Sequence, residues 1–272
     1  MNSDQPPAYV CEINGVPATA EDLAPLAFAG YGHYTSMQVR GSAVRGLDLH
    51  LERLRRSGIE LFGAAPDAIH LRGLLRRVVV SAGGEASVQV NFFSRDSGAL
   101  LAGGAVHPDV LVRTSAPVVW DELPMRVQTV PFQRLLPHVK NADTLGLTMH
   151  LRRAVAAGFD DAIFLTPDGQ LSEGTIWNVA FADAEGVVWP DAPALPGITQ
   201  ALVRQGLDRL GVPWRTKRIG LSDLHGFTGA AFMNSWTPGQ PIDTVDDVRF
   251  ADSAGLTGTM HAAYSRVSPQ RV

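Results

Sequence analysis

Lys140 and Glu173 are a lysine and a glutamate, two residue types that can together form a covalent cofactor site. A lysine amine can form a Schiff base with a carbonyl compound, and a carboxylate can hold a cofactor's ring nitrogen in its protonated form. Between them the sequence predicts a helix, a strand, a tight turn and a second strand, and this path can return the carboxylate to the neighbourhood of the amine. The segments beside Lys140 are apolar, so we expect a half-buried amine that can act as a nucleophile.

The elements that must position these residues follow from the spacing of apolar side chains. In the first half of the chain we expect strands at 31–40, 86–93 and 109–116, a helix from Asp48 to Gly58 and a second helix at 66–80. In the second half we expect strands at 125–130, 162–166, 171–182, 214–219 and 230–236, and helices at 141–157, 198–210 and 252–267. This mixture indicates an α+β protein.

Residues 117–124, with the sequence PVVWDELP, are the best candidate for an interdomain linker because prolines bracket them. The predicted domains are a small N-terminal α/β domain at 1–117 and a larger cofactor-binding domain at 125–272, with the linker at 118–124.

The composition indicates a globular protein and excludes several classes. A formal net charge of -4 leaves no excess of basic side chains to neutralise phosphates, so we expect no nucleic-acid partner. The histidines show no metal-binding spacing, so we expect no metal site, and the lone Cys11 fits a reducing compartment. No signal peptide and no apolar run of roughly 18 residues is visible, which indicates a cytoplasmic protein that does not bind to or span a membrane.

Three short motifs accompany Lys140. Glu173 opens the segment EGTIWN, which ends at Asn178; Arg53 lies in the helical segment HLERL; and the segment LPGIT predicts a helix start whose unpaired amides could bind a phosphate. Each feature alone also has a structural explanation: a surface lysine, a strand carboxylate, a satisfied strand amide, a solvated helix arginine and a capped helix. Together, and in this order, they resemble the class IV aminotransferases, which are the fold-type-IV pyridoxal-phosphate enzymes.

The resemblance covers Tyr31 to Pro241 and implies a fold, a cofactor and residue roles. A small α/β domain would pack on a larger pseudo-barrel domain, with pyridoxal 5′-phosphate in the cleft between them and at least a homodimer as the assembly. Lys140 would be the catalytic Schiff-base lysine, and Glu173 would contact the pyridine nitrogen. The other cofactor-binding residues would be Arg53, Asn178, Gly197, Ile198, Thr199, Ser235 and Trp236, and the turn that holds Ser235 and Trp236 departs from the family's run of small residues.

The expected substrate pocket departs most from the family. Its candidate residues are Tyr31, Tyr34, Met37, Gln38, Arg95 and Thr237. Arg95 could bind a substrate carboxylate through two hydrogen bonds, and an exposed loop arginine is an equal alternative. The family's aminodeoxychorismate lyases tend to have threonine where Gln38 falls. The sequence therefore favours an aminotransferase that moves an amino group between an amino acid or amine and a 2-oxo acid, with such a lyase or a catalytically weak cofactor-binding protein as alternatives.

Overall fold

The computed structural model describes residues 9–272, which form two compact units. The small unit contains the described residues up to Val119 together with Val139–Asp143 and Pro269–Val272, and the large unit contains Trp120–His138 and Thr144–Ser268. The predicted domain at 125–272 differs from the large unit because two short segments of it make their contacts within the small unit. One of these two segments carries Lys140.

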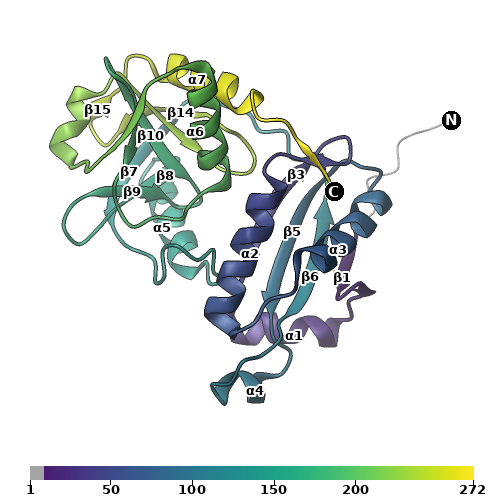
Figure 1. The fold of residues 1–272 in the computed structure, drawn as a ribbon. Coiled ribbons are helices and arrows are strands. Elements are labelled where there is room, and N and C mark those ends of the chain that lie inside the picture. The colour runs from purple at the N-terminus through teal and green to yellow at the C-terminus, as the bar shows by residue number, and fades with distance from the viewer. Residues whose placement is uncertain (1–8) are drawn as a thin grey trace. The chain divides into compact units, whose positions relative to one another are not determined.

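The small unit is built on an antiparallel sheet with the order β2-β1-β6-β5-β3 (Figure 1). The strands are β1 (Cys11–Ile13), β2 (Val16–Pro17), β3 (Gly32–Val39), β5 (Ala86–Phe93) and β6 (Asp109–Ser115). The turn between β1 and β2 has φ angles of 52° at Asn14 and 82° at Gly15, the left-handed pair that a two-residue hairpin needs. Strands β3, β5 and β6 confirm the strands that the sequence predicted at 31–40, 86–93 and 109–116.

Helices α2 (Leu47–Phe62) and α3 (Ala68–Ser81) cover one face of this sheet and form its main core (Figure 1). The prediction that Gly58 ends the first helix was wrong. The helix continues to Phe62 and ends at Gly63, which has a φ of 72° and donates its N–H to the Ile59 carbonyl. Gly58 is instead a buried residue inside the helix, where a Cβ would lie only 3.0 Å from Ala65 Cβ. A small residue at this position lets the helix pack closely.

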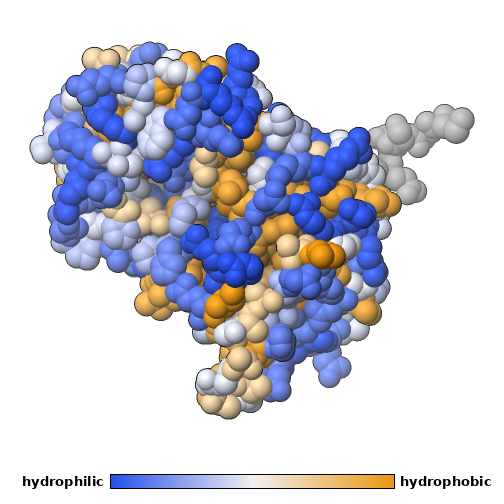
Figure 2. Space-filling view, viewed as in Figure 1, coloured by the Kyte–Doolittle hydropathy of each residue, from blue (hydrophilic) through white to orange (hydrophobic). Residues whose placement is uncertain are grey.

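Short elements complete the small unit. They are α1 (Ala20–Ala29), β4 (Ala43–Val44), α4 (Ser97–Leu101) and β16 (Gln270–Arg271), which pairs with β4. The Thr19 hydroxyl caps α1 by accepting from the Asp22 amide, and the Asp22 carboxylate accepts from the Thr19 amide. The surface around α4 is pale orange at the lower end of Figure 2, and Leu101 at the end of this helix is 86% exposed.

The large unit contains a pseudo-barrel. Within residues 9–272, six strands close on themselves in the order β10-β13-β14-β7-β8-β9, and the pairing of Glu173 with Asn178 joins β9 to β10. These strands are β7 (Met125–Pro131), β8 (Asp161–Leu165), β9 (Leu171–Gly174), β10 (Asn178–Asp183), β13 (Gly229–Met233) and β14 (Gln240–Val245). The sheet continues from β10 through β11 (Gly186–Pro190) to β12 (Trp214–Lys217), and β15 (Val248–Arg249) pairs with β14. The strand expected at 171–182 is therefore two strands, separated by a turn at 175–177.

Helices α6 (Ile198–Leu210) and α7 (Ser253–Ser265) pack against each other and against the inner strands of the barrel sheet (Figure 1). The other helices of this unit are α5 (Leu145–Ala156) and the 3-10 helix η1 (Leu221–Gly226). Helix α6 begins and ends where the sequence predicted. Helix α5 begins after the predicted residue 141, because Asn141 pairs as a β-bridge with His33. No helix within residues 9–272 combines the length and the hydropathy that crossing a membrane requires.

Candidate active site

Glu173 is held by a buried arginine that the sequence motifs did not indicate. Arg134 Nε donates to Glu173 Oε1 at 2.8 Å, and Arg134 Nη2 donates to Glu173 Oε2 at 3.3 Å. Both side chains are only 7% exposed. The same guanidinium donates to the Pro137 carbonyl at 2.6 Å, which anchors the arginine in the loop after β7. The carboxylate therefore has a fixed orientation and a countercharge in a region with little water.

The loop that enters α6 is clamped by Glu173 and Asn178 together. The Leu195 amide donates to Glu173 Oε2 at 3.1 Å, and Asn178 Nδ2 donates to the Leu195 carbonyl at 2.8 Å. Because the two residues face each other where β9 meets β10, both side chains reach the same residue of the loop. The structure thus brings Glu173, Asn178 and the start of α6 together.

Gly197 caps α6, and its surroundings leave no room for a side chain. A Cβ at this position would lie 1.8 Å from Asn178 Oδ1. The first amides of a helix have no partner within the helix, and no side chain caps them here. Ile198 and Thr199, the first two residues of the helix, are 9% and 8% exposed. The result is a set of amide donors at the positive end of the helix dipole, beside the loop that Glu173 holds.

The turn between β9 and β10 is fixed by a buried carboxylate, Asp161. It accepts from Thr175 Oγ1 at 2.7 Å and from Trp177 Nε1 at 2.8 Å. Burial raises the pKa of Asp161, and the hydrogen bonds from the turn oppose that rise. Gly174 is required in the same turn, since a Cβ there would lie 2.8 Å from the Phe232 ring. The glycine of the EGTIWN motif therefore has a packing cause.

The loop after β13 contains three predicted site residues, and two of them have other partners. The Trp236 ring stacks on Trp120 with 5.0 Å between centroids, and the Trp236 amide donates to Asn234 Oδ1 at 2.8 Å. Thr237 is 3% exposed, and its hydroxyl donates to Glu122. Both contacts attach the start of the large unit to this loop. Of the three residues, the half-buried Ser235 remains the candidate for contact with a phosphate.

Lys140 lies in the small unit, on an extended segment that pairs with the edge of β3. The Tyr34 amide donates to the Lys140 carbonyl at 2.8 Å, and the Ala142 amide donates to the Gly32 carbonyl at 2.8 Å. Lys140 Nζ lies 4.7 Å from the centroid of the Tyr34 ring, a cation–π distance. Lys140 is half-buried, as its apolar flanks suggested.

Arg53 is also in the small unit. It extends from α2 to β3, where its Nη2 donates to Thr35 Oγ1 at 2.6 Å. The structure therefore places the predicted residues in two groups. Lys140, Tyr34 and Arg53 belong to the small unit, whereas Glu173, Asn178 and the start of α6 belong to the large unit.

Met37 does not line a pocket, and its prediction as a substrate-facing residue was wrong. It is 1% exposed and lies in the core that packs against α2 and α3. Side chains alternate along β3, so Tyr34 and Gln38 lie on the opposite face and are half-buried. Gln38 Oε1 accepts from Ser87 Oγ at 2.9 Å and from the Val118 amide at 3.2 Å. The position remains polar but is already hydrogen-bonded.

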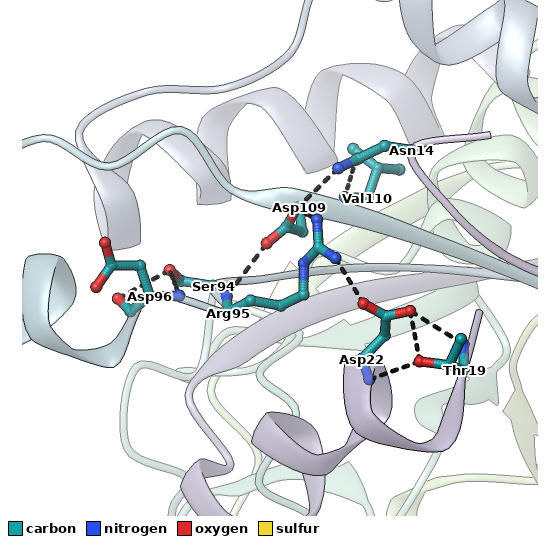
Figure 3. Close-up of polar contacts among 8 residues, drawn as sticks. All are labelled: Asn14, Thr19, Asp22, Ser94, Arg95, Asp96, Asp109 and Val110. Atoms are coloured by element: carbon teal, nitrogen blue, oxygen red, sulfur yellow. Dashed lines mark hydrogen bonds and ion pairs between the residues drawn. The ribbon is translucent and has the colours of Figure 1, made fainter. Parts of the chain in front are cut away.

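Arg95 is held by two carboxylates (Figure 3). It donates to Asp22 at 2.7 Å and to Asp109 at 2.9 Å, and these contacts connect the end of β5 to α1 and to β6. A pocket of about 340 Å³ lies beside it, lined by α1, the end of β5, α4 and Tyr31. Tyr31 donates its hydroxyl to the Leu61 carbonyl at 2.8 Å. Because its charge is already balanced, we do not assign Arg95 to a substrate carboxylate.

The family model for class IV amino-transferases matches residues 32–261. The chain belongs to this family. Its fold is the α+β fold-type-IV transaminase fold, with a small N-terminal sheet and a six-strand pseudo-barrel within the described residues. The predicted fold class is thereby confirmed, and the chain is an enzyme of the class IV aminotransferase family.

Comparisons with individual class IV proteins agree with this assignment. A probable branched-chain-amino-acid aminotransferase of Rickettsia felis is 30% identical over 96 residues, which are 35% of this chain and 33% of the relative. The match thus spans about a third of the length of that curated relative. Among solved structures, the branched-chain aminotransferase of Thermoproteus uzoniensis with norvaline has a TM-score of 0.81 at 21% identity, covering 95% of this chain and 94% of its own. A hypothetical aminotransferase of Mycobacterium tuberculosis in its PLP-bound form has a TM-score of 0.76 at 22% identity, covering 94% and 99%.

The residues of the large unit fit pyridoxal phosphate by their chemistry. An ionised carboxylate offers about four acceptor positions, and three donors already contact that of Glu173, so one position remains for a protonated ring nitrogen. The start of α6 supplies amide donors suited to a phosphate dianion. Among residues 9–272 no group of three or more histidine, cysteine or acidic side chains could hold a metal ion.

Proposed function

We propose that this chain is a pyridoxal-phosphate-dependent aminotransferase that moves an amino group between an amino acid or amine and a 2-oxo acid. Lys140 would hold the cofactor covalently, Glu173 would bind its ring nitrogen, and Arg53 with the start of α6 would bind its phosphate. The observation that carries this proposal is the double clamp on Leu195, because it attaches the loop that enters α6, and with it the amide donors of the helix start, to the Glu173 carboxylate. Those are the two protein functions that pyridoxal phosphate requires besides the lysine.

Pyridoxal phosphate, when bound, supplies an electron-accepting ring that stabilises the carbanion left when a substrate amine loses its α-proton. The Glu173 carboxylate would keep the ring nitrogen protonated, and Arg134 would hold that carboxylate in place. Once a substrate amine displaces it, the Lys140 amine would accept the α-proton and return it to a different carbon, as general base and then as general acid. The rest of the fold serves to orient these groups.

The test is to locate the covalent bond. Borohydride reduction of the protein loaded with pyridoxal phosphate, followed by peptide mapping, should place the label on Lys140. Lys217, on β12, is the only other lysine in the sequence. Its Nζ is paired with Asp223 Oδ1 at 2.9 Å, so it serves as an internal control. Lys140→Ala should lose the label and all turnover and keep the fold. A label on Lys217 would contradict the proposal.

An elimination reaction is the main alternative, because both reactions begin with removal of the same proton. Return of the proton needs only the Lys140 amine, whereas elimination also needs a leaving group held in line. A screen of D- and L-amino acids and amines, read by the spectral conversion of the cofactor, should find at least one amino donor. Release of pyruvate from aminodeoxychorismate without any oxo-acid acceptor would instead establish the lyase, and no conversion by any amine would establish a catalytically weak protein.

The assembly we propose is a homodimer, as the family resemblance implies. Sedimentation of the purified protein over a range of concentrations measures it, and a monomer at concentrations where the enzyme is active would contradict it.

A further inference from the structure

The Thr35 hydroxyl lies at the centre of a buried network in the small unit. Its Oγ1 is 2.6 Å from His50 Nδ1 and 2.6 Å from Arg53 Nη2. Thr35 is 0% exposed and His50 is 4% exposed, so the hydrogen bond between them is shielded from water, whereas the bond to the half-buried Arg53 is partly buried. His50 and Arg53 are one helical turn apart on α2, and therefore both face β3. The proposed function uses Arg53 alone of these three residues.

The direction of each hydrogen bond follows from the donors available. A guanidinium has only donors, so Arg53 donates and the Thr35 oxygen accepts. The hydroxyl proton is then free to be donated to His50 Nδ1, which must accept it as a neutral imidazole. Burial, followed by the nearby charges of Arg53 and Lys140, holds the pKa of His50 well below its usual range. The neutral form that the network needs is therefore the form that its surroundings favour.

The location of this network is unusual for polar side chains. Thr35 shares the inner face of β3 with Met37 and Val39, which belong to the apolar core against α2 and α3. A valine has the same shape as threonine and would suit that core without a buried hydroxyl. The hydroxyl is satisfied on both sides, by the arginine and by the histidine. This arrangement suggests that its role is to orient the arginine.

We propose that Thr35 and His50 are positioning residues that fix the Arg53 guanidinium for binding the cofactor's phosphate group. His50 fixes the rotation of the Thr35 hydroxyl, and the hydroxyl oxygen fixes one nitrogen of the guanidinium. An arginine held in one rotamer loses less entropy when it binds an anion, so the phosphate is bound more tightly. This inference rests on the proposed function, because it assigns Arg53 to the phosphate of pyridoxal phosphate.

The test compares pyridoxal phosphate with pyridoxal, which has the same ring and aldehyde but no phosphate. Dissociation constants of both are measured for the unaltered chain, Thr35→Val and Thr35→Ser. Thr35→Val should weaken binding of pyridoxal phosphate by about 10-fold to 100-fold, the usual effect of losing a hydrogen bond to a charged group. Its affinity for pyridoxal should change by less than about threefold. Thr35→Ser retains the hydroxyl and should keep most of the affinity for pyridoxal phosphate.

Two further variants separate orientation from general loss of stability. Thr114→Val removes another buried hydroxyl of the small unit, one that accepts from the Val10 amide at 3.0 Å, and should leave the ratio of the two affinities unchanged. His50→Asn keeps an acceptor near the Nδ1 position, whereas His50→Leu does not. The phosphate-dependent loss should therefore be larger in His50→Leu than in His50→Asn, and this pair answers the question if Thr35→Val does not fold.

Each outcome has a definite meaning. A loss confined to pyridoxal phosphate in Thr35→Val or His50→Leu, with recovery in Thr35→Ser or His50→Asn, supports the inference. Equal losses for both ligands, or none, overturn it while the proposed function stands, provided that the unaltered chain binds pyridoxal phosphate through Lys140. If the unaltered chain binds no pyridoxal phosphate, the proposed function fails and the inference fails with it.

Discussion

The pairing with Arg134 fixes the orientation of the Glu173 carboxylate and balances its charge. A carboxylate on a side chain that is only 7% exposed has little access to water, so its charge must be balanced by protein groups. The Arg134 guanidinium donates to both carboxylate oxygens, and the Leu195 amide donates to Oε2 as well. The acid is therefore oriented before any ligand arrives, and a bound ring nitrogen would meet it without rearrangement.

Glu173→Gln should leave pyridoxal phosphate bound and slow removal of the α-proton on the order of 10²-fold or more, because a neutral amide cannot keep the ring nitrogen protonated. Single-turnover absorbance measurements with an amino donor give this rate. Glu185→Gln, an exposed carboxylate of the same unit, is the matched control and should have an unchanged rate. An unchanged rate in Glu173→Gln would mean that the carboxylate has only a structural role.

Arg134→Met should destabilise the large unit by about 3–5 kcal/mol, because it leaves the Glu173 carboxylate buried without a countercharge. Adding Glu173→Gln to the same chain should recover part of that loss, since the uncompensated charge is then gone. Arg215→Met removes a partly exposed arginine paired with Asp183, and should cost about 1 kcal/mol or less. Denaturant unfolding of the cofactor-free variants measures all three, and a double variant no more stable than Arg134→Met would contradict this account.

At the scale of elements, the start of α6 depends on close packing between a glycine and the side chain of a strand residue. Gly197 lies so near Asn178 that a Cβ would overlap its Oδ1. The Nδ2 group of the same Asn178 side chain donates to the Leu195 carbonyl. Helix position and strand position are therefore set by one contact.

Gly197→Ala should displace the first turn of α6, weaken pyridoxal phosphate binding by about 10-fold or more, and lower the free energy of unfolding by about 1–3 kcal/mol. In combination with Asn178→Ala, which removes the overlapping amide, the stability loss from Gly197→Ala should be smaller than it is alone. Gly211→Ala is not a suitable control, because that glycine has a φ of 66°. Gly226→Ala is suitable, since no atom lies within 4 Å of a Cβ there. Additive losses in the double variant would contradict the overlap.

The sequence predicted elements well where one pattern decided them. The alternation Ala86–Phe93 and the helix Ile198–Leu210 were both found at the predicted residues. The helix expected from residue 141 begins later, at Leu145, because residues 140–142 pair with β3 instead of forming the first turn. Strands β11 and β14 were not predicted. The break at 175–177 was missed because it depends on hydrogen bonds to Asp161, a residue of strand β8 that lies outside the local pattern.

For the candidate site, sequence motifs indicated residues with chemical functions and missed those that hold them. Arg134 lies in a loop without regular structure, and no motif in the sequence indicated it. Thr35 and Met37 lie on the same face of β3, and the sequence alone could not show that this is the core face. A period of two identifies which residues share a face, but the fold decides which face is buried.

At the scale of the whole molecule, the two histidines whose pKa is lowered most by burial both lie in the small unit. Burial, with a smaller effect of the Arg53 charge, lowers the pKa of His33 in the small unit to about 3. Burial likewise lowers the pKa of His50. In the large unit, burial raises the pKa of Asp161. The neutral form of each of these groups is the one that the folded state favours.

Lowering the pH from about 6.5 toward about 3 should therefore destabilise the small unit, because the unfolded histidines bind protons that the folded ones do not. The free energy of unfolding should fall by roughly 1.4 kcal/mol per pH unit for each such histidine. Asp161 acts in the opposite direction, since its folded pKa is the higher one. His33→Leu should reduce the slope.

Two spectroscopic signals can separate the units. All five tryptophans of the sequence lie in the large unit, so their fluorescence follows that unit, whereas circular dichroism follows both. On acidification, the denaturation midpoint seen by circular dichroism should fall more than the midpoint seen by fluorescence. Equal shifts in both signals, or an unchanged slope in His33→Leu, would contradict the assignment to buried histidines.

The pairing of Glu173 with Asn178 closes the barrel, and the same two side chains hold the loop at the start of α6. The seam of the barrel therefore shares a pair of residues with the candidate cofactor site, and the loop at the start of α6 is hydrogen-bonded to both sides of that seam. A ligand bound to that loop holds the seam closed, so its binding energy is added to folding, by about 2.7 kcal/mol when its concentration is 100 times its dissociation constant. Pyridoxal phosphate would then act as a folding ligand of the barrel as well as a reagent.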